Sequence, residues 1–331
     1  MRPGETLVGR RATLLMAATV AAGINPPAHG AGSPIRIALV MTDANPFLAP
    51  DAAQKLGFFD KVGVKAEITG YSGGSTAMEA LASGAADVSI FVPADVSMAV
   101  KQGVKAKIVA VSLLNHRDWK LFVRKDSPIA SMAQLANKKV GITASGSATD
   151  FLALWGAKRA NVSIVRVPVG GAGLAPNLLS GNIDAVVTFP QITYALENSG
   201  SARAIMDFGD FPPGDPMRKV IQSCWVASDN IIASNPDGLR RMLVGVFSAI
   251  AHMKKNPDKA RAFIEKEMKV PAETAKLEYA DAVTDYSDDG AIRLDSLVPS
   301  LEFLSLAGMT DMPSGKDIYT DAFVPVKVGE S

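Results

Sequence analysis

The feature that most restricts the fold of this chain is a regular alternation of short apolar strands with amphipathic helices. The alternation begins at Ser33 and continues to about residue 188. Since strands joined by helices pair in parallel, we predict an α/β protein whose mostly parallel sheets carry helices on both faces. The predicted strands are 35–40, 64–71, 88–92, 106–113, 139–143, 163–167 and 184–188, and the predicted helices are 50–58, 76–83, 148–160 and 173–179.

The alternation falls into two blocks, and the second begins near residues 125–128. Extended segments at 119–124 and 220–227 bracket this block. We interpret them as paired hinge strands through which the chain leaves one lobe and returns to it. A length of 331 residues agrees with two domains of roughly 150 residues each. The predicted domains are a discontinuous first lobe of 34–118 plus 228–331 and a second lobe of 119–227 with the hinge strands at its ends.

After Asp229 the sequence predicts helices almost throughout. Asn235-Pro236 and Asn256-Pro257 are typical helix starts, because asparagine caps a helix and proline suits its first position. Between them, apolar residues recur at helical spacing from Leu239 to Met253. We expect these helices, and others at 275–283 and 299–307, to pack back on the first lobe.

Residues 1–30 have the order of a secretory signal peptide: a positive start, an apolar run at 12–24 and then small residues. The apolar run is too short to span a membrane. The Arg10-Arg11 pair is compatible with twin-arginine export, but the residues after it match that motif poorly, which favours an ordinary Sec signal. No cysteine lies near the cleavage site for a lipid anchor, so we expect a soluble protein in the periplasm.

The charge balance and the rarity of metal-binding side chains exclude several function classes. The chain has 34 basic and 33 acidic residues, and removal of 1–30 leaves 31 and 32, a net charge of −1. A nucleic-acid binder normally shows a basic excess, so we expect no nucleic-acid partner. With one cysteine, Cys224, and three scattered histidines, we expect no disulfide, no metal site and no cofactor.

Two turns rich in glycine and serine occupy similar places in the two blocks, each between a strand and a helix. Glycine allows close approach of a ligand, and the free N–H groups at the start of the following helix suit an anionic group. Plain helix capping by Ser75 and Ser147 is the alternative, but the matched places favour a ligand site. The candidate ligand-binding residues in these turns are Ser72, Gly73, Gly74 and Ser75, and Ser145, Gly146, Ser147 and Ala148.

Residues that follow the other predicted strands are further candidates, because ligands of α/β sheets bind beyond the carboxyl ends of the strands. Arg117 is a nearby cation that could join the site, although a solvated turn is the simpler role for it. Phe47 and Trp225 are aromatic residues that could wall the cleft or belong to the core. The candidate ligand-binding residues in this group are Asn45, Pro93, Asn115 and Phe189.

Gly70-Tyr71-Ser72-Gly73-Gly74 fits the Gly-x-Ser-x-Gly pattern of a serine hydrolase, with His116 or His252 as the base. Such patterns arise by chance in glycine-rich turns, and Gly74-Ser75 lengthens this turn beyond a nucleophile elbow. The sequence contains no phosphate-binding Gly-Lys-Ser/Thr loop, no three-glycine dinucleotide fingerprint and no His-Glu-x-x-His motif. We therefore expect a binding protein and not an enzyme, with no catalytic residue.

Five segments, in this order along the chain, resemble periplasmic solute-binding proteins of ABC transporters. The resemblance is to the nitrate/sulfonate/taurine group, which is similar to riboflavin and thiamine-pyrimidine binders. It covers residues 34–230 well and the helical C-terminus loosely. The segments are 55–64 (KLGFFDKVGV), 80–88 (ALASGAADV), 121–129 (LFVRKDSPI), 135–147 (LANKKVGITASGS) and 178–185 (LLSGNIDA).

The resemblance implies a monomer with the two-lobed periplasmic-binding-protein fold of type II. Its lobes would close on a small-molecule solute and deliver it to an ABC permease in the inner membrane. The group it resembles implies an alkanesulfonate, taurine or a related carboxylate as the solute. A vitamin precursor, such as a thiamine pyrimidine or riboflavin, is the alternative that aromatic walls without strong anion donors would favour. An enzyme, either a Ser72 hydrolase or of the pyrimidine-synthase type, is a third, but this chain lacks the cluster of His and Cys that the synthase type needs.

Overall fold

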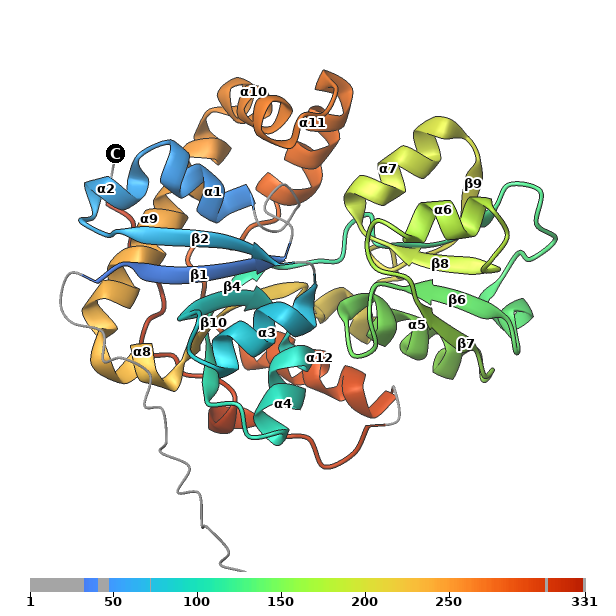
Figure 1. Ribbon diagram of the computed structural model, residues 1–331, viewed down its shortest axis with the longest axis horizontal. Coiled ribbons are helices and arrows are strands. Elements are labelled where there is room, and N and C mark those ends of the chain that lie inside the picture. Colours follow the sequence, from blue (N-terminus) through green and yellow to red (C-terminus); the bar gives the residue numbers. More distant parts are fainter. Residues whose placement is uncertain (1–32, 41–47, 72, 307–308, 330–331) are drawn as a thin grey trace, which may run out of the picture.

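The computed structural model describes residues 33–40, 48–71, 73–306 and 309–329. It has two α/β lobes, each built on a five-stranded sheet (Figure 1). The first sheet has the order β2-β1-β3-β10-β4, with β1 Ile35–Val40, β2 Ala66–Tyr71, β3 Val88–Phe91, β4 Ala106–Leu113 and β10 Ser223–Ser228. The second has the order β7-β6-β8-β5-β9, with β5 Lys120–Arg124, β6 Lys139–Ile142, β7 Val165–Pro168, β8 Ala185–Thr188 and β9 Ala202–Asp207.

Both sheets are mostly parallel, as predicted, and both place one antiparallel strand in the fourth position. In the first sheet β1 pairs in parallel with β2 and β3, whereas β10 pairs antiparallel with β3 and β4. In the second sheet β6 pairs in parallel with β7 and β8, whereas β5 pairs antiparallel with β8 and β9. The two lobes therefore repeat one topology, and the predicted fold class is confirmed.

The predicted pairing of the two hinge strands is wrong. Residues 120–124 form β5 inside the second sheet, and residues 223–228 form β10 inside the first, so the two segments lie in different lobes. The physical reason is backbone hydrogen bonding: β10 pairs with β3 and β4 and β5 pairs with β8 and β9, so both edges of each strand are already occupied within its own sheet. The chain crosses between the lobes at 114–119 and 208–222, and residues 223–227 belong with the first sheet rather than the second lobe.

Helices cover both faces of each sheet. In the first lobe they are α1 Leu48–Lys55, α2 Phe58–Lys61, α3 Gly74–Ala82, α4 Pro93–Lys101, α8 Asp229–Ser234, α9 Pro236–Lys255, α10 Pro257–Met268 and α11 Ala272–Glu278, which continues as a π-helical turn, Tyr279–Val283. In the second they are α5 Ala148–Arg159, α6 Leu174–Leu179 and α7 Pro190–Ser199. Short 3₁₀ turns lie at Met132–Leu135, Pro216–Lys219 and Gly315–Asp317. Helices α2, α4 and α7 and strand β9 lie outside the predicted set.

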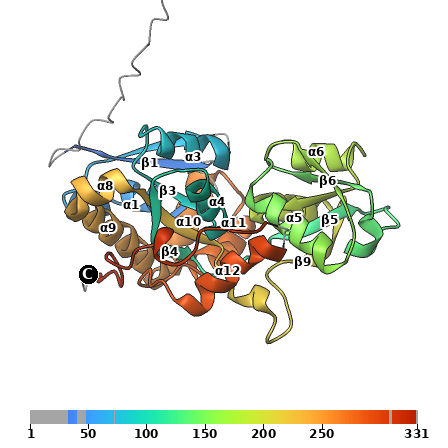
Figure 2. The ribbon, with the colours of Figure 1, turned by 90° about the horizontal axis from the view of Figure 1, so that it is seen from below.

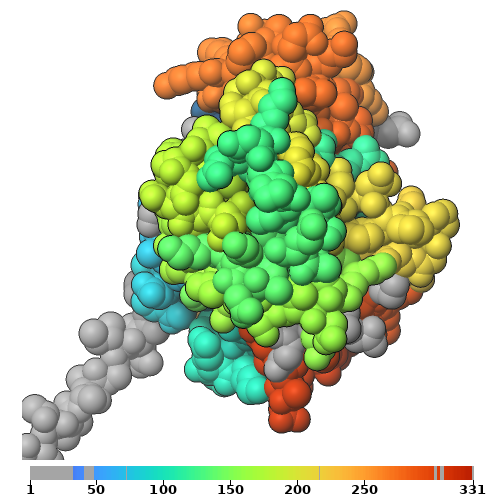
Figure 3. Space-filling view, turned by 90° about the vertical axis from the view of Figure 1, so that its right-hand side faces the viewer, coloured from blue at the N-terminus to red at the C-terminus, as the bar shows by residue number. Residues whose placement is uncertain are grey.

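The apolar stripe predicted after Asn235 is the buried face of α9, which packs on α1, α2 and β1. Leu239, Met242, Leu243, Val246 and Phe247 are completely buried there. Figure 3 looks at the second lobe end-on, in green and yellow, and shows the orange α10–α11 segment of the first lobe extending beyond it. The prediction that α9, α10 and α11 pack on the first lobe is confirmed.

Helix α12, Leu294–Leu306, lies across the two lobes instead of on the first alone. It contacts α4 of the first lobe, α5 of the second and the turn at 216–219 (Figure 2). The Ser300 hydroxyl accepts a hydrogen bond from the backbone N–H of Ile221 at 2.8 Å, and Leu304 is buried in the core of the second lobe. The predicted signal peptide, residues 1–30, lies outside the described residues, and no described helix is both long and apolar enough to cross a membrane.

Candidate functional site

A cavity of about 370 Å³ lies between the two lobes. The first lobe lines it with the carboxyl ends of β1 and β3, with α3 and α4, and with the start of β10. The second lobe lines it with the turn between β6 and α5 and with the residue after β8. The cavity thus lies where strand ends of both sheets meet, which is the usual ligand position in α/β proteins.

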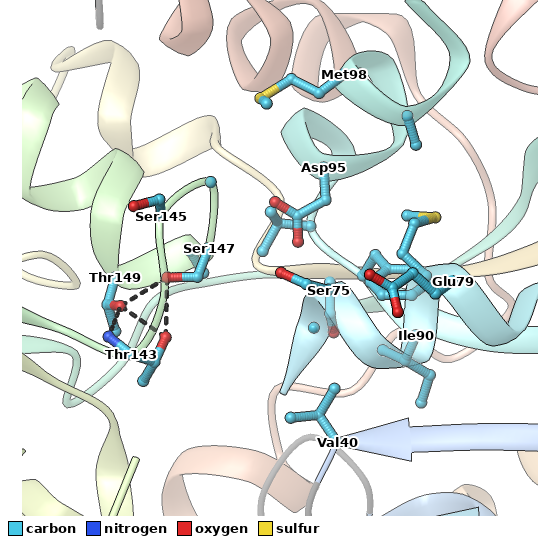
Figure 4. A pocket seen from close by; sticks show the side chains of 18 of the residues that line it. Val40, Ser75, Glu79, Ile90, Asp95, Met98, Thr143, Ser145, Ser147 and Thr149 are labelled. Carbon is cyan, nitrogen blue, oxygen red and sulfur yellow. Dashed lines mark hydrogen bonds between the residues drawn. The ribbon is translucent and has the colours of Figure 1, made fainter. Parts of the chain in front are cut away.

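The structure brings seven of the candidate ligand-binding residues together at this cavity. They come from both glycine–serine turns and from the end of β8: Gly74, Ser75, Ser145, Gly146, Ser147, Ala148 and Phe189. The two turns are more than 65 residues apart in sequence and face each other across the cleft (Figure 4). That these residues bind a ligand stays a prediction.

The other candidates do not line the cavity in the part of the chain that the structure describes. Gly73 is the N-cap residue of α3, and Pro93 begins α4 and lines a small hollow beside His116. Asn115 is held by Asp285, which accepts from its backbone N–H at 2.7 Å and from its side-chain amide at 2.6 Å. Asn45 and Ser72 lie outside the described residues, as does Phe47.

In the second lobe, Ser147 both caps α5 and lines the cavity. Its hydroxyl accepts from the N–H of Asp150 at 3.4 Å, so the capping interpretation holds for this serine. The hydroxyls of Thr143, Ser147 and Thr149 lie within 2.8 to 3.0 Å of one another (Figure 4). This cluster fixes the turn and presents hydroxyl groups to the cavity.

A carboxylate of the protein itself already occupies the start of α5. Asp150 is 1% exposed and accepts from the N–H of Gly146 at 2.8 Å and from Arg166 Nη1 at 2.7 and 2.9 Å. The partial positive charge of a helix N-terminus favours one nearby anion. Because Asp150 supplies it, the start of α5 attracts a ligand anion less than the sequence predicts.

In the first lobe, the start of α3 is more open. Gly73 takes the N-cap position with an extended backbone and no side-chain cap, so the capping role considered for Ser75 is wrong. Ser75 lies within the first turn and is exposed at the cavity. The first N–H groups of a helix have no partner within it. Among the described residues, no atom outside the chain neighbours and the helix's own backbone lies within 4 Å of a Cβ built on Gly73 or Gly74. The described residues therefore leave this turn open to a ligand.

The walls of the cavity are largely apolar and aromatic. Met78, Ile90 and Phe91 come from the first lobe, and Phe189 from the second. Trp119, at the end of the first crossing segment, lies 6.0 Å from Phe189 between ring centroids. Trp225, the other aromatic considered for the cleft, is fully buried in the core of the first lobe because β10 is an internal strand.

No Lys, Arg or His is among the described residues that line the cavity, and its charged side chains are those of Glu79 and Asp95. Residues 41–47 and Ser72, which the structure leaves undescribed, contain no Lys, Arg or His either. Arg117 points elsewhere: its side chain is 49% exposed and pairs with Asp285 at 3.6 Å. The predicted supporting cation is therefore absent from the described lining.

Two acceptor oxygens in this lining have no hydrogen-bond partner among the described residues. They are Oδ1 of Asp95, in the first turn of α4, and Oε1 of Gln222, just before β10. Burial alone raises the pKa of Asp95 well above its ordinary value. Neither residue was identified from the sequence. An aspartate in the first turn of a helix is common, because its charge interacts favourably with the helix dipole.

The two histidines considered as hydrolase bases do not line the cavity. Burial lowers the pKa of His116 to about 4, although a hydrogen bond to the backbone of Val220 opposes the shift, so its imidazole is neutral. His252 lies on α9 against Phe58, at 5.5 Å between ring centroids. No three His, Cys, Asp or Glu side chains gather for a metal ion in the described ranges.

Comparison with known proteins agrees with this architecture. A family model described as NMT1/THI5 like matches residues 47–260, which is more than half of the chain. A protein of Brucella abortus (strain 2308), provisionally named a binding protein, is 24% identical over 287 residues, covering 84% of each chain.

Two solved structures illustrate the range of proteins that share the fold. The periplasmic aliphatic sulphonate binding protein SsuA from Escherichia coli superimposes with a TM-score of 0.66 at 18% identity, covering 83% of this chain and 85% of that one. The desulfurization enzyme DSZB gives a TM-score of 0.60 at 16% identity, covering 87% and 97%. The two-lobed periplasmic-binding-protein fold and the family resemblance are thereby confirmed, and the chain belongs to the NMT1/THI5-like family.

Proposed function

We propose that this protein is the extracytoplasmic solute-binding component of an ABC importer. It would act as a monomer in the periplasm, capture a small solute between its lobes and deliver it to a permease. The observation that carries the proposal is the cavity of about 370 Å³, which residues from both lobes line. The binding-protein names of the Brucella relative and of the E. coli neighbour support it.

The mechanism requires no chemical step. A solute that touches Ser75 on one side and Ser147 on the other makes contacts that the open form cannot make, so its binding shifts the equilibrium toward closure. The segments 114–119 and 208–222 would absorb the rotation, as the connections between the lobes. Residues 120–207 would move as one unit relative to the two parts of the first lobe, which lie before residue 114 and after residue 222.

An organic anion, such as an alkanesulfonate, taurine or a carboxylate, is one class of solute that the site could take. The free start of α3 and the hydroxyls of Thr143, Ser147 and Thr149 can donate hydrogen bonds to its oxygens. The sulphonate-binding neighbour favours this class.

An uncharged or nitrogen-containing aromatic solute, such as a vitamin precursor, is the second class. Trp119, Phe91 and Phe189 offer apolar surface for a ring, and no cation lines the described part of the cavity to compensate an anion. The two histidines considered as the base of a Ser72 hydrolase, His116 and His252, do not line the cavity, which disfavours that enzyme.

Thermal unfolding with a panel of solutes tests the proposed function. The panel comprises taurine, alkanesulfonates, carboxylates, nitrate, aminopyrimidines and flavins. A ligand at 100 times its Kd should stabilise the protein by about 2.7 kcal/mol, which is a rise of several degrees in Tm. If no member raises Tm and ester or other turnover is found instead, the proposal is wrong.

A further inference from the structure

The most distinctive chemical feature of the cavity is a pair of unpartnered acceptors in a lining whose described residues include no cation. Asp95 Oδ1 and Gln222 Oε1 are both buried, and neither finds a donor in the described protein. Native proteins pair nearly all buried polar groups, so each exception needs a reason. Both side chains line the same cavity, so a bound ligand that donates hydrogen bonds would explain why both acceptors lack a partner.

A purely structural role does not explain the position of the Asp95 carboxyl group. An acidic side chain in the first turn of α4 interacts favourably with the helix dipole, and this accounts for the residue type. It does not account for the direction of the side chain. Figure 4 shows the carboxyl group pointing from α4 into the space between Ser75 and Ser147.

The surroundings of this carboxyl group favour hydrogen-bond donors on the ligand. The second charged group of the lining, Glu79, is also acidic, and no described lining residue is a cation. The titratable side chain near Asp95 on β10 is that of Cys224. Its sulfur donates to the Phe91 carbonyl at 3.0 Å and therefore not to Asp95. A ligand with N–H groups stabilises the ionised Asp95 carboxylate against the burial that disfavours it, whereas an anion offers that carboxylate no hydrogen-bond donor.

We propose that the solute carries nitrogen-bound hydrogens at its polar end, as an amine, amidine or amino-substituted ring does, and that Asp95 and Gln222 accept them. The apolar part of the solute would lie against Trp119 and Phe189. Asp95 is then the residue that selects nitrogen-containing solutes over anions. This inference rests on the proposed solute-binding function and names the class of its ligand.

Benzamidine and benzoate are suitable probes, because they have nearly the same shape and opposite charge. Isothermal titration should show that the wild-type protein binds benzamidine and binds benzoate at least tenfold more weakly. Asp95→Asn should lower the affinity for benzamidine at least tenfold, because it replaces an acceptor with an amide that can also donate. The amide of an asparagine can donate to an anion, so the affinity for benzoate should stay equal or rise.

Two further variants separate binding from folding. Gln222→Met removes the second acceptor, keeps the backbone N–H of residue 222 that donates to Leu113, and should also weaken benzamidine. Asp126→Asn changes an exposed carboxylate outside the cavity lining and should leave both affinities unchanged. Each variant is first checked for a single cooperative unfolding transition.

The possible results distinguish this inference from the function on which it rests. Benzamidine affinity that is equal in the wild type and Asp95→Asn overturns the inference, and so does tighter binding of benzoate than of benzamidine. If neither probe binds but the solute panel contains an anion that raises Tm, the inference fails and the proposed function stands. If no compound of either set binds, both fail.

Discussion

A contact between the lobes near the first crossing segment leads to a pH-dependent prediction. The hydroxyl of Tyr194, on α7 of the second lobe, donates to Asp281 Oδ2 of the first lobe at 2.5 Å. The carboxyl group of Asp118, in the crossing segment, also hydrogen-bonds Asp281. Burial, and then the contact with Asp118, raise the pKa of Asp281 to about 7, although the hydrogen bond from Tyr194 and the charge of Arg117 oppose the shift. Below that pH, one proton is shared between the two carboxyl groups.

The sign and size of the effect follow from the shift. The folded state holds the proton of Asp281 up to about pH 7, whereas the unfolded chain releases it near 3.8. The unfolded state therefore binds fewer protons in between, and the free energy of unfolding falls as the pH rises from about 4 to 7. A pKa raised that far corresponds to about 4 kcal/mol. Because Asp281 is only partly buried, solvent screening reduces the expected loss to about 1–2 kcal/mol.

Urea unfolding of the wild type and Asp281→Asn between pH 4.5 and 7.5 measures this loss. The asparagine cannot titrate and keeps the shape of the protonated carboxyl group. The wild type should therefore lose about 1–2 kcal/mol more than Asp281→Asn over this range. Asp60→Asn, on the exposed face of α2, should behave like the wild type. Parallel curves for the wild type and Asp281→Asn would refute the reasoning.

Two other substitutions give clear expectations. Ser147→Trp should fill the cavity and abolish ligand binding, whereas loss of the helix cap should lower the free energy of unfolding by only about 1 kcal/mol. Calorimetric titration measures the binding and thermal unfolding measures the stability. Unchanged affinity would show that this turn is not part of the site. Gly290→Ala should lower the free energy of unfolding by about 2–3 kcal/mol, because Gly290 has φ +68° and a Cβ there would lie 2.8 Å from Phe247 and 2.9 Å from Ala110. Gly103→Ala, with positive φ and open space around it, should cost about 1 kcal/mol in the same denaturant titration, and equal losses would contradict the packing argument.

The local pattern of the sequence predicts most strands of this protein but not their neighbours. Strands β1 and β4 have the predicted limits, 35–40 and 106–113. Periodicity reports that a segment is buried and extended, and it carries no information on which strand lies beside it. The strands at 120–124 and 223–228 therefore looked like a pair, although each is the antiparallel strand of a different sheet.

The sequence likewise predicts only part of the candidate site. Both glycine–serine turns could be found from the sequence because their residue types at strand-to-helix junctions are unusual. Trp119, Asp95 and Gln222 could not be found, because an aromatic residue, a first-turn aspartate and a glutamine in a connecting segment occur at many structural positions. Their direction toward the cavity depends on how α4 and the two crossing segments pack.

The sequence by itself determined the α/β class, the two-lobed organisation and the family, since each follows from local periodicity or from the order of short segments. The tertiary structure alone decided that β5 and β10 enter different sheets. It alone also decided that the described cavity lining contains two acidic side chains and no cation. The reason is that the composition of a cleft depends on which side chains face it, and residues far apart in the chain set that direction through packing.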